Sequence, residues 1–373
     1  MVARNLILEL LLAPRSLASL SAMDWDLLVR QGQRANLLSR LAHVLADMSL
    51  LDTVPDAPRQ HLCSAMRVTD RQTIAVRWEV HCLLEAFSRA GIPLILLKGA
   101  AYLMAGLPAS KGRMFSDVDI IVAKPLIAGA ESALMQHGWR SAEMSDYDQR
   151  YYRQWMHELP PMTHVRRGTT VDVHHTILPE TARLKVNTAA LLADIGELPG
   201  TQGIHVLPPI DMLLHSATHL FHEGEFDNAL RDLFDLDAML RHFPQVAGGE
   251  TFWIDLVPRA SVLGLTRPLY YALRYTTLLL GTPVPETVMS LARKGRPARA
   301  VVSLMDACYT RALLPLHASL GGAGAKAARA ALYLRSHWVR MPMHLLTLHL
   351  GRKALTRLFE KKPEAPTAPA IDR

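Results

Sequence analysis

The sequence predicts an α+β fold, in which a mixed β-sheet backed by helices lies between two helical regions. Between residues 91 and 207, short runs of β-branched and other apolar residues alternate with glycines, prolines and polar residues, as strands and turns do. On both sides of this segment, apolar residues recur at the spacing of amphipathic helices. With 373 residues, of which 50% are hydrophobic, the chain can bury a sizeable core.

The first region, residues 1–90, is expected to be helical. Its apolar residues recur at helical spacing in the segments 6–12, 25–48 and 57–91. Ser21 or Asp24 is suited to cap the second segment, because a short side-chain oxygen can accept a hydrogen bond from a free backbone N–H.

The second region, residues 91–207, is expected to form the sheet. A short helix is predicted at 100–104, and a longer one at 125–137, which Gly138 ends. The predicted strands cover residues 92–97, 118–123, 139–143, 161–165 and 169–176.

The third region, residues 208–360, is predicted to be helical again after Pro208-Pro209. Its clearest helices are expected at 210–222, 228–241 and 253–264, and we interpret the region as a lid or an acceptor-binding lobe. The glycine-rich residues 318–325 should form a loop or hinge. The Pro/Ala-rich residues 361–373 are expected to be a disordered tail.

Two carboxylates at the start of a strand are the most informative feature of the sequence. Asp117 and Asp119 stand two residues apart before an apolar run, and strand side chains alternate between faces, so both should point the same way. Like charges this close repel each other. We therefore expect a hard, oxygen-seeking cation, Mg²⁺ or Mn²⁺, between them. The alternative is an Asp-rich turn before a buried strand.

Two further segments supply candidate partners for this pair. Lys98-Gly99 follows the predicted strand 92–97; there the glycine would let backbone N–H groups approach a phosphate, and the lysine offers a mobile charge. Alternatively, Gly99 merely ends the strand and Lys98 is a solvated edge lysine. Farther along, the alternation in residues 169–176 places Asp172 and His174 on one face of another strand. Asp172 is thus a third candidate carboxylate.

A strand ending in L-K-G, the segment R-x-F-S-D-V-D-I-I-V and a strand carrying V-D-V-H-H follow one another in the chain. This order resembles the nucleotidyltransferase superfamily, which has the polymerase-β-like fold. More narrowly, it resembles a bacterial branch of uncharacterised members, in which lysine-glycine replaces the usual glycine-glycine or glycine-serine turn. A later stretch, residues 215–240, also matches. The resemblance extends over residues 25–350, and its specific motifs lie within 91–176.

The resemblance implies a nucleotidyltransferase-type mixed sheet and a metal-dependent chemistry. Asp117 and Asp119 would ligate the divalent metal that bridges the nucleotide phosphates. Asp172 would complete a two-metal arrangement or act as a base toward the acceptor hydroxyl. The implied activity is transfer of a nucleoside monophosphate from an NTP to a hydroxyl or phosphate on a small molecule, sugar, peptide or protein.

The resemblance also assigns residues to the nucleotide phosphates. Gly99 would hold the triphosphate and Ser116 would orient the loop. From the residues alone, Lys98 is a further candidate for phosphate contact, and His174, which shares the face of Asp172, is a candidate for substrate contact. The lysine replaces a usual glycine, and the interval from Gly99 to the carboxylates is longer than in the minimal motif. A second hypothesis is therefore a nucleotide-binding or scaffold protein that keeps the fold without turnover.

Arg113, just before the carboxylates, has two interpretations. Its planar guanidinium suits phosphate oxygens, which favours a phosphate clamp. Alternatively, it forms a salt bridge that orients Asp117 or Asp119. The residue type and position support both.

Three histidines raise the possibility of a zinc site. His215, His219 and His222 have i, i+4, i+7 spacing and would share a helix face. The stretch departs from the H-E-x-x-H pattern, because Phe226 stands in place of the second histidine. A packed or nucleotide-facing helix is the preferred interpretation, and a metal-dependent phosphohydrolase using these histidines is the third hypothesis.

Charge and cysteine content bound the remaining possibilities. The three cysteines are far apart and lack C-x-x-C spacing, which is typical of a reducing compartment. We expect a cytoplasmic protein without a signal peptide or a transmembrane span. Residues 290–373 carry 15 Lys/Arg against 4 Asp/Glu, which suits either ordinary solvated helices or contact with an anionic partner or membrane surface. Aromatic and basic residues are not interleaved in the way that would indicate nucleic-acid binding.

Overall fold

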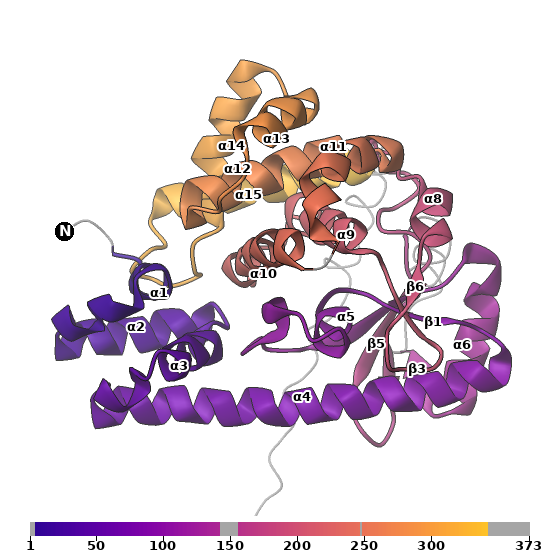
Figure 1. The fold of residues 1–373 in the computed structure, drawn as a ribbon, viewed down its shortest axis with the longest axis horizontal. Helices are drawn as coiled ribbons and strands as arrows, with labels where there is room; N and C mark the ends of the chain where they lie inside the picture. The colour runs from indigo at the N-terminus through magenta and orange to yellow at the C-terminus, as the bar shows by residue number, and fades with distance from the viewer. Residues whose placement is uncertain (1–3, 142–155, 247, 342–373) are drawn as a thin grey trace, which may run out of the picture.

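The computed structural model describes residues 4–141, 156–246 and 248–341 of the chain. In these ranges a mixed sheet of seven strands lies among many helices (Figure 1), so the predicted α+β class is confirmed. The strands are β1 (Leu94–Leu96), β2 (Asp117–Ile121), β3 (Trp139–Ser141), β4 (Met162–His164), β5 (Thr170–His174), β6 (Gly196–Glu197) and β7 (Ile204–Val206).

The sheet has the order β3-β4-β5-β2-β1-β7-β6. Strand β2 is parallel to β5 on one side and antiparallel to β1 on the other, and β1 is parallel to β7. The remaining pairs are antiparallel. Because β2 lies in the middle of the sheet, its acidic residues are placed at the centre of the fold rather than at an edge.

The first five strands match the predicted ones to within three residues at each end, apart from positions 142 and 143 of the third, which lie outside the described ranges. Strands β6 and β7 were not predicted. They are two and three residues long, too short for an alternating pattern to show in the sequence.

Four helices form the N-terminal region: α1 (Leu6–Leu12), α2 (Ala22–Arg34), α3 (Leu38–Asp47) and α4 (Asp56–Ala90). The side chain of Ser21 caps α2, and Asp24 completes a capping box with it. The prediction of a single helix at 25–48 is wrong. The helix is interrupted at Asn36, which has φ +54°, so that α2 and α3 are separate helices. Asparagine tolerates this left-handed conformation better than most residues, and a helix cannot continue through it.

The helices that flank the sheet are α5 (Lys98–Met104), α6 (Ile127–Gln136) and α8 (Thr188–Ala193). Helix α4 is 35 residues long and runs the width of the molecule below the sheet in Figure 1, in contact with β1 and β2. It covers the face of β2 that carries Val118, which is 3% exposed. The opposite face of β2 is therefore available to the helices that follow the sheet.

The C-terminal helices are α9 (Pro209–His222), α10 (Ala229–His242), α11 (Phe252–Leu263), α12 (Thr266–Leu280), α13 (Glu286–Ala292), α14 (Arg299–Ala312) and α15 (Ala323–Arg340). The predicted loop at 318–325 is shorter than expected, because α15 begins at Ala323. The predicted tail, 361–373, lies outside the described ranges. No helix in the described ranges is both long and apolar enough to cross a membrane.

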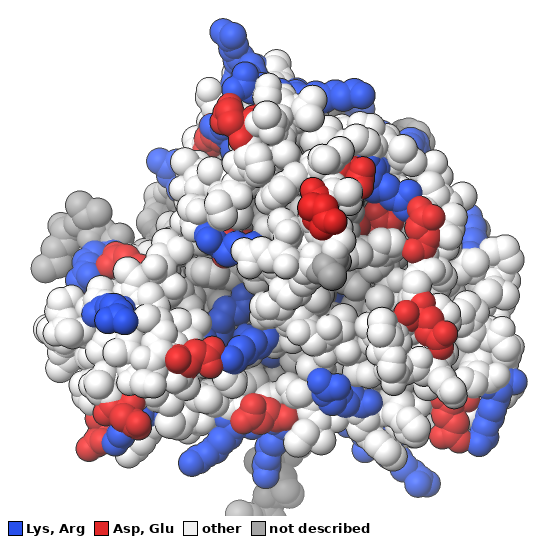
Figure 2. All heavy atoms as spheres, viewed as in Figure 1, with Lys and Arg blue, Asp and Glu red and all other residues white. Residues whose placement is uncertain are grey.

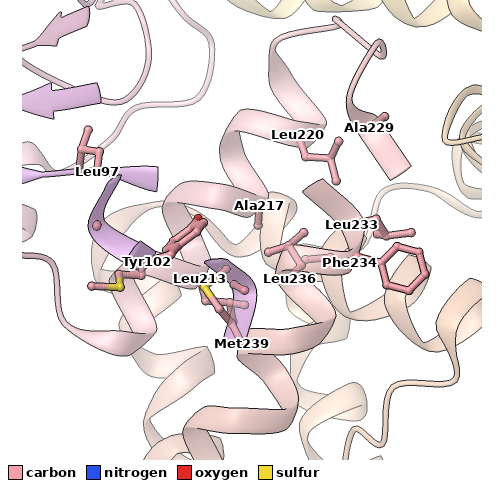
Figure 3. Packing of buried hydrophobic residues seen from close by; sticks show 14 of the residues in the cluster. Leu97, Tyr102, Leu213, Ala217, Leu220, Ala229, Leu233, Phe234, Leu236 and Met239 are labelled. Atoms are coloured by element: carbon pink, nitrogen blue, oxygen red, sulfur yellow. The ribbon is translucent and has the colours of Figure 1, made fainter. Parts of the chain in front are cut away.

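Helices α9 and α10 are packed together by apolar side chains, which Figure 3 shows at close range. Leu213 and Ala217 of α9 lie against the side of α10 that carries Leu236 and Met239, and all four are at most 1% exposed. Tyr102 of α5 lies beside the same cluster and shares a short hydrogen bond with a serine of α9. This packing holds α9 and α10 together, and Tyr102 joins α5 to α9.

The division into regions 1–90, 91–207 and 208–360 stays a prediction. The buried apolar side chains of all three regions form one cluster, which runs from Leu6 to Leu332. On the face shown in Figure 2, Lys and Arg side chains are interspersed with Asp and Glu. Part of the predicted basic excess falls on residues 342–373, outside the described ranges.

Candidate functional site

The three predicted carboxylates lie on one face of the sheet. In the parallel pair β2–β5, Asp119 is the register partner of Asp172, and Asp117 stands two residues before Asp119 on the same strand. Register partners on neighbouring strands point to the same side and are about 4.8 Å apart in backbone. The alternate residues, Val118 and Ile120, are buried on the other face.

Asp119 is buried, with 5% of its surface exposed, and it contacts two basic side chains. The Nζ of Lys98 donates to its Oδ1 at 2.9 Å, and the Nε2 of His174 lies 3.2 Å from the same oxygen. Burial alone would raise the pKa of Asp119, but Lys98 and His174 hold it well below its ordinary value. Asp119 is therefore an anion even without a bound metal.

The other two carboxylates lack such compensation. Burial and the charge of Asp119 raise the pKa of Asp117, whose Oδ1 accepts a hydrogen bond from Ser116 Oγ at 2.9 Å. Burial, followed by repulsion from Asp119 and Asp117, raises the pKa of Asp172 to about 7. The Oδ1 of Asp172 is buried and has no hydrogen-bond partner among the residues that the structure describes. Buried polar atoms are rarely left unpaired, so this oxygen is available to a ligand such as a cation.

A cavity of about 250 Å³ opens between this face and helices α9 and α10. Among the predicted site residues, Lys98, Arg113, Ser116, Asp117 and Asp119 line it, whereas Gly99, Asp172 and His174 do not. The opposite wall comes from α9, α10 and the segment between them. Its polar side chains are Ser216, His219, Glu225, Asp227, Asn228, Arg231, Asp232 and Asp235.

Arg113 forms a salt bridge, but not with the carboxylates of β2. Its Nε donates to Asp235 Oδ2 on α10 at 2.8 Å, so the interpretation that it orients Asp117 or Asp119 is wrong. Gly99 allows this arrangement, because a Cβ at that position would overlap the guanidinium of Arg113. The role of Arg113 as a phosphate clamp stays a prediction.

Asp235 joins three parts of the chain. The carboxylate of Asp235 accepts hydrogen bonds both from Arg113 and from Arg40 of α3, the second at 2.5 Å. The same nitrogen of Arg40 also donates to the carbonyl of Ala109 at 2.6 Å. Arg231, one turn earlier on α10, donates to the carbonyl of Met114 at 3.3 Å. We call Arg40, Arg113 and Asp235 the buried clamp. It fixes the segment that leads into the carboxylates of β2.

Sequence reasoning missed the buried clamp. The only local signal is the R-D-L-F-D pattern of α10, which spaces Asp232 and Asp235 by one helical turn. Such a pattern is also common on solvated helix faces, and the partners of Asp235 are 122 and 195 residues away.

Comparison with known protein families gives a match over most of the chain. A family model described as uncharacterised nucleotidyltransferase matches residues 21–281, from the N-cap of α2 to the residue after α12. This chain belongs to that family. Comparisons with curated proteins and with solved structures give no match. The resemblance inferred from the motifs is thereby confirmed, and the match includes the entire sheet and the α9–α10 wall of the cavity.

One departure from the nucleotidyltransferase pattern now has a structural correlate. Lys98, which replaces the usual glycine, has φ +44°, a left-handed conformation that costs a non-glycine residue about 1–3 kcal/mol. Its side chain is 16% exposed and ion-paired to Asp119. Burial would lower the pKa of Lys98, but Asp119 raises it, so the side chain is a cation. The same residue thus combines a strained backbone with a positive charge that contacts the carboxylate of Asp119.

The three histidines of α9 do not converge in this nucleotidyltransferase family member. His219 pairs with Glu223 at 2.7 Å. His215 and His222 are buried, and burial lowers the pKa of both, that of His222 to about 3. In the described part of the chain, these histidines do not form a group that could hold a metal ion. The structure therefore removes the basis for a zinc site on α9 and for the phosphohydrolase hypothesis built on it.

Proposed function

We propose that this protein is a Mg²⁺- or Mn²⁺-dependent nucleotidyltransferase that moves a nucleoside monophosphate from an NTP to an acceptor. The observation that carries the proposal is the arrangement of Asp117, Asp119 and Asp172 on one face of β2 and β5, beside a cavity. Family membership supports nucleotidyl transfer in general. The metal, the nucleotide and the acceptor are the proposed parts.

The chemistry of the donor set fits a hard divalent cation, although in the described ranges one oxygen from each of the three carboxylates does not lie within 4.8 Å of the others, so an ion would have to draw them together. All three side chains offer carboxylate oxygens, the ligands such ions prefer, and Asp172 Oδ1 is a buried oxygen without a hydrogen-bond partner in the described ranges. Burial first, and then repulsion between the carboxylates, raises the pKa values of Asp117 and Asp172, and a bound cation would relieve the repulsion. When bound there, the ion would neutralise charge on the transferred phosphoryl group and orient it for in-line attack.

The side chains of the protein would do the remaining work. Asp172, whose pKa is about 7 without a bound cation, would either complete the metal site or, as an alternative to ligation, accept the proton of an acceptor hydroxyl. Lys98 lines the cavity with a buried ammonium group, which can pair with phosphate oxygens. His174, whose Nε2 contacts Asp119, would keep that carboxylate in place.

The cavity wall favours one class of acceptor. Glu225 and Asp227, both exposed, line it from the segment between α9 and α10. Their charges would repel a second polyanion. A hydroxyl on a neutral or cationic acceptor therefore fits better than a phosphate, and the α9–α10 segment is the proposed acceptor-binding wall.

One observation favours the second hypothesis, a binding protein without turnover. The Nζ of Lys98 lies 2.9 Å from Asp119 Oδ1 and so takes a position that a metal ion would share. Such a protein would bind an NTP but transfer nothing. Transfer activity separates the two hypotheses.

The experiment uses full-length protein, Mg²⁺ or Mn²⁺, fractionated cell extract and each NTP labelled at either the α- or the γ-phosphate. Transfer of α-label, but not γ-label, to an acceptor is the expected result for the wild type. Asp119→Asn and Asp172→Asn should each abolish it. Asp26→Asn is the control, because Asp26 is an exposed residue of α2 that pairs with Arg30 on the same helix. NTP binding without α-label transfer would support the non-catalytic hypothesis, and transfer retained in both active-site variants would contradict the proposed site.

A further inference from the structure

A second group of metal-ligating side chains lies beside β5, outside the cavity. Its members are His157, Glu158 and His174. Glu158 forms an isolated antiparallel bridge with His174, and the backbone N–H of His175 donates to the carbonyl of His157 at 2.8 Å. These backbone contacts hold the three side chains close together. Sequence reasoning missed the group, because His157-Glu158 precedes a pair of prolines and shows no strand pattern.

The distances in the group fit a single ion. Glu158 Oε2 lies 3.3 Å from His174 Nδ1 and 3.8 Å from His157 Nε2. One ligand atom from each residue lies within 4.8 Å of the others, and within the described ranges this is the only such group of three. Ligands bound to one transition-metal ion at about 2.0–2.2 Å are separated by at most about twice that length. A small contraction would bring all three into coordination.

The two imidazoles are buried, with 5% and 3% of their surfaces exposed. The Nδ1 atoms of His157 and His174 have no hydrogen-bond partner in the described part of the chain. The Nδ1 of His174 is the atom that faces Glu158. Buried ring nitrogens are rarely left without partners, and a metal ion in the group would satisfy that of His174.

We propose that His157, Glu158 and His174 bind a transition-metal ion such as Zn²⁺, at a site separate from the carboxylates of the proposed function. Two imidazoles and one carboxylate form a donor set that suits such ions better than Mg²⁺. The protein supplies three ligands, which leaves further positions for water or another group.

The site would act on the carboxylate face through His174. With Nδ1 on the metal, the proton of this imidazole is fixed on Nε2, which lies 3.2 Å from Asp119 Oδ1. Metal-bound histidines commonly donate their other N–H to a carboxylate in this way. His174 would then be a positioning residue, which fixes the orientation of Asp119 without touching a substrate.

Co²⁺ is the probe, because its visible absorption changes when nitrogen and oxygen side-chain ligands replace its bound water. Full-length protein is titrated with Co²⁺ in millimolar Mg²⁺, which occupies the carboxylate site. One Co²⁺ per chain is expected, and X-ray absorption should show two imidazoles on it. His157→Ala and Glu158→Gln should weaken Co²⁺ binding by about tenfold or more.

Two control variants distinguish binding at this site from binding at the carboxylates or at an isolated histidine. His205 on β7 also has a buried Nδ1 without a partner but belongs to no such group in the described ranges, so His205→Ala should bind Co²⁺ as the wild type does. Asp117→Asn should also retain Co²⁺ binding. Circular dichroism checks that each variant is folded, and the wild-type absorption spectra identify the ligands even if a variant fails to fold.

The proposal is overturned if folded wild-type protein binds no Co²⁺ in the presence of Mg²⁺, or if the bound ion has no imidazole ligands. It is also overturned if Asp117→Asn abolishes binding while His157→Ala retains it. In either case His174 would instead be a protonated imidazole between Glu158 and Asp119. The proposed nucleotidyl transfer does not depend on this outcome, because its metal binds to different residues.

Discussion

Replacing Asp235 with alanine is the sharpest perturbation of the site that touches none of the proposed metal ligands. Asp235 has a side chain only 4% exposed, and it pairs with Arg113 and Arg40, whose side chains are each 10% exposed. Asp235→Ala would remove the anion paired with buried Arg40 and would leave buried Arg113 with only the longer contact to Asp232, at 3.9 Å. Breaking a buried ion pair from one side costs about 3–5 kcal/mol, and because two cations share this carboxylate we expect the upper half of that range.

The free energy of unfolding is measured by urea unfolding at neutral pH. The affinities for Mg²⁺ and NTP are then measured by titration without urea, under conditions in which the variant is folded. The reference variant is Asp26→Ala, whose exposed pair with Arg30 should contribute less than about 1 kcal/mol. Asp235→Ala should also weaken metal and NTP binding, because the buried clamp holds the segment that enters β2. Equal loss of stability in Asp235→Ala and Asp26→Ala would refute the reasoning, as would wild-type NTP affinity in a destabilised Asp235→Ala.

Three other substitutions test the electrostatics and packing of the site. Lys98→Gly removes a cation that competes with a metal ion for Asp119, and it relieves the strain of the left-handed backbone at position 98. The Mg²⁺ affinity measured by calorimetry should therefore rise about tenfold, and a lower affinity would contradict this. Asp172 has a folded pKa of about 7, above its unfolded value, so metal-free stability should fall as pH rises from 4 to 7, by at most about 4 kcal/mol. As pH falls below 7, metal affinity should fall by up to about tenfold per pH unit. Both trends should weaken in Asp172→Asn, and a smaller part should remain because the pKa of Asp117 is also raised. Gly99→Ala places a methyl group against a buried guanidinium and should cost about 1–3 kcal/mol in thermal unfolding, whereas Gly196→Ala, with nothing within 4 Å, should cost under 1 kcal/mol.

The carboxylate face was predictable because strand alternation is a local property. The two-residue spacing of Asp117 and Asp119 fixes their common side, whatever the rest of the chain does. That Asp172 joins them depends on the parallel register of β2 and β5, which no local pattern encodes. For that step the prediction depended on family resemblance.

The buried clamp and the His157-Glu158 pair were not predictable for a related reason. Asp235 stands in an ordinary amphipathic helix pattern, and only the tertiary fold brings Arg40 and Arg113 to it. Glu158 is paired with β5 through a single bridge, too little to leave a periodic signal. The break between α2 and α3 had a weak signal in Asn36, which interrupts an otherwise helical apolar pattern.

The Lys98–Asp119 pair has a consequence for the order of binding under the proposed function. A metal ion on Asp119 would compete with the ammonium group of Lys98, which lies 2.9 Å from the same carboxylate. A displaced ammonium would remain largely buried and would need another anion, since unpaired buried charges are costly. The side chain lines the cavity, where the phosphates of an NTP would supply that anion. Metal and nucleotide should therefore bind more tightly together than either does alone. The metal ion would displace the ammonium group of Lys98 from Asp119, and the phosphates of the NTP would then pair with that ammonium group.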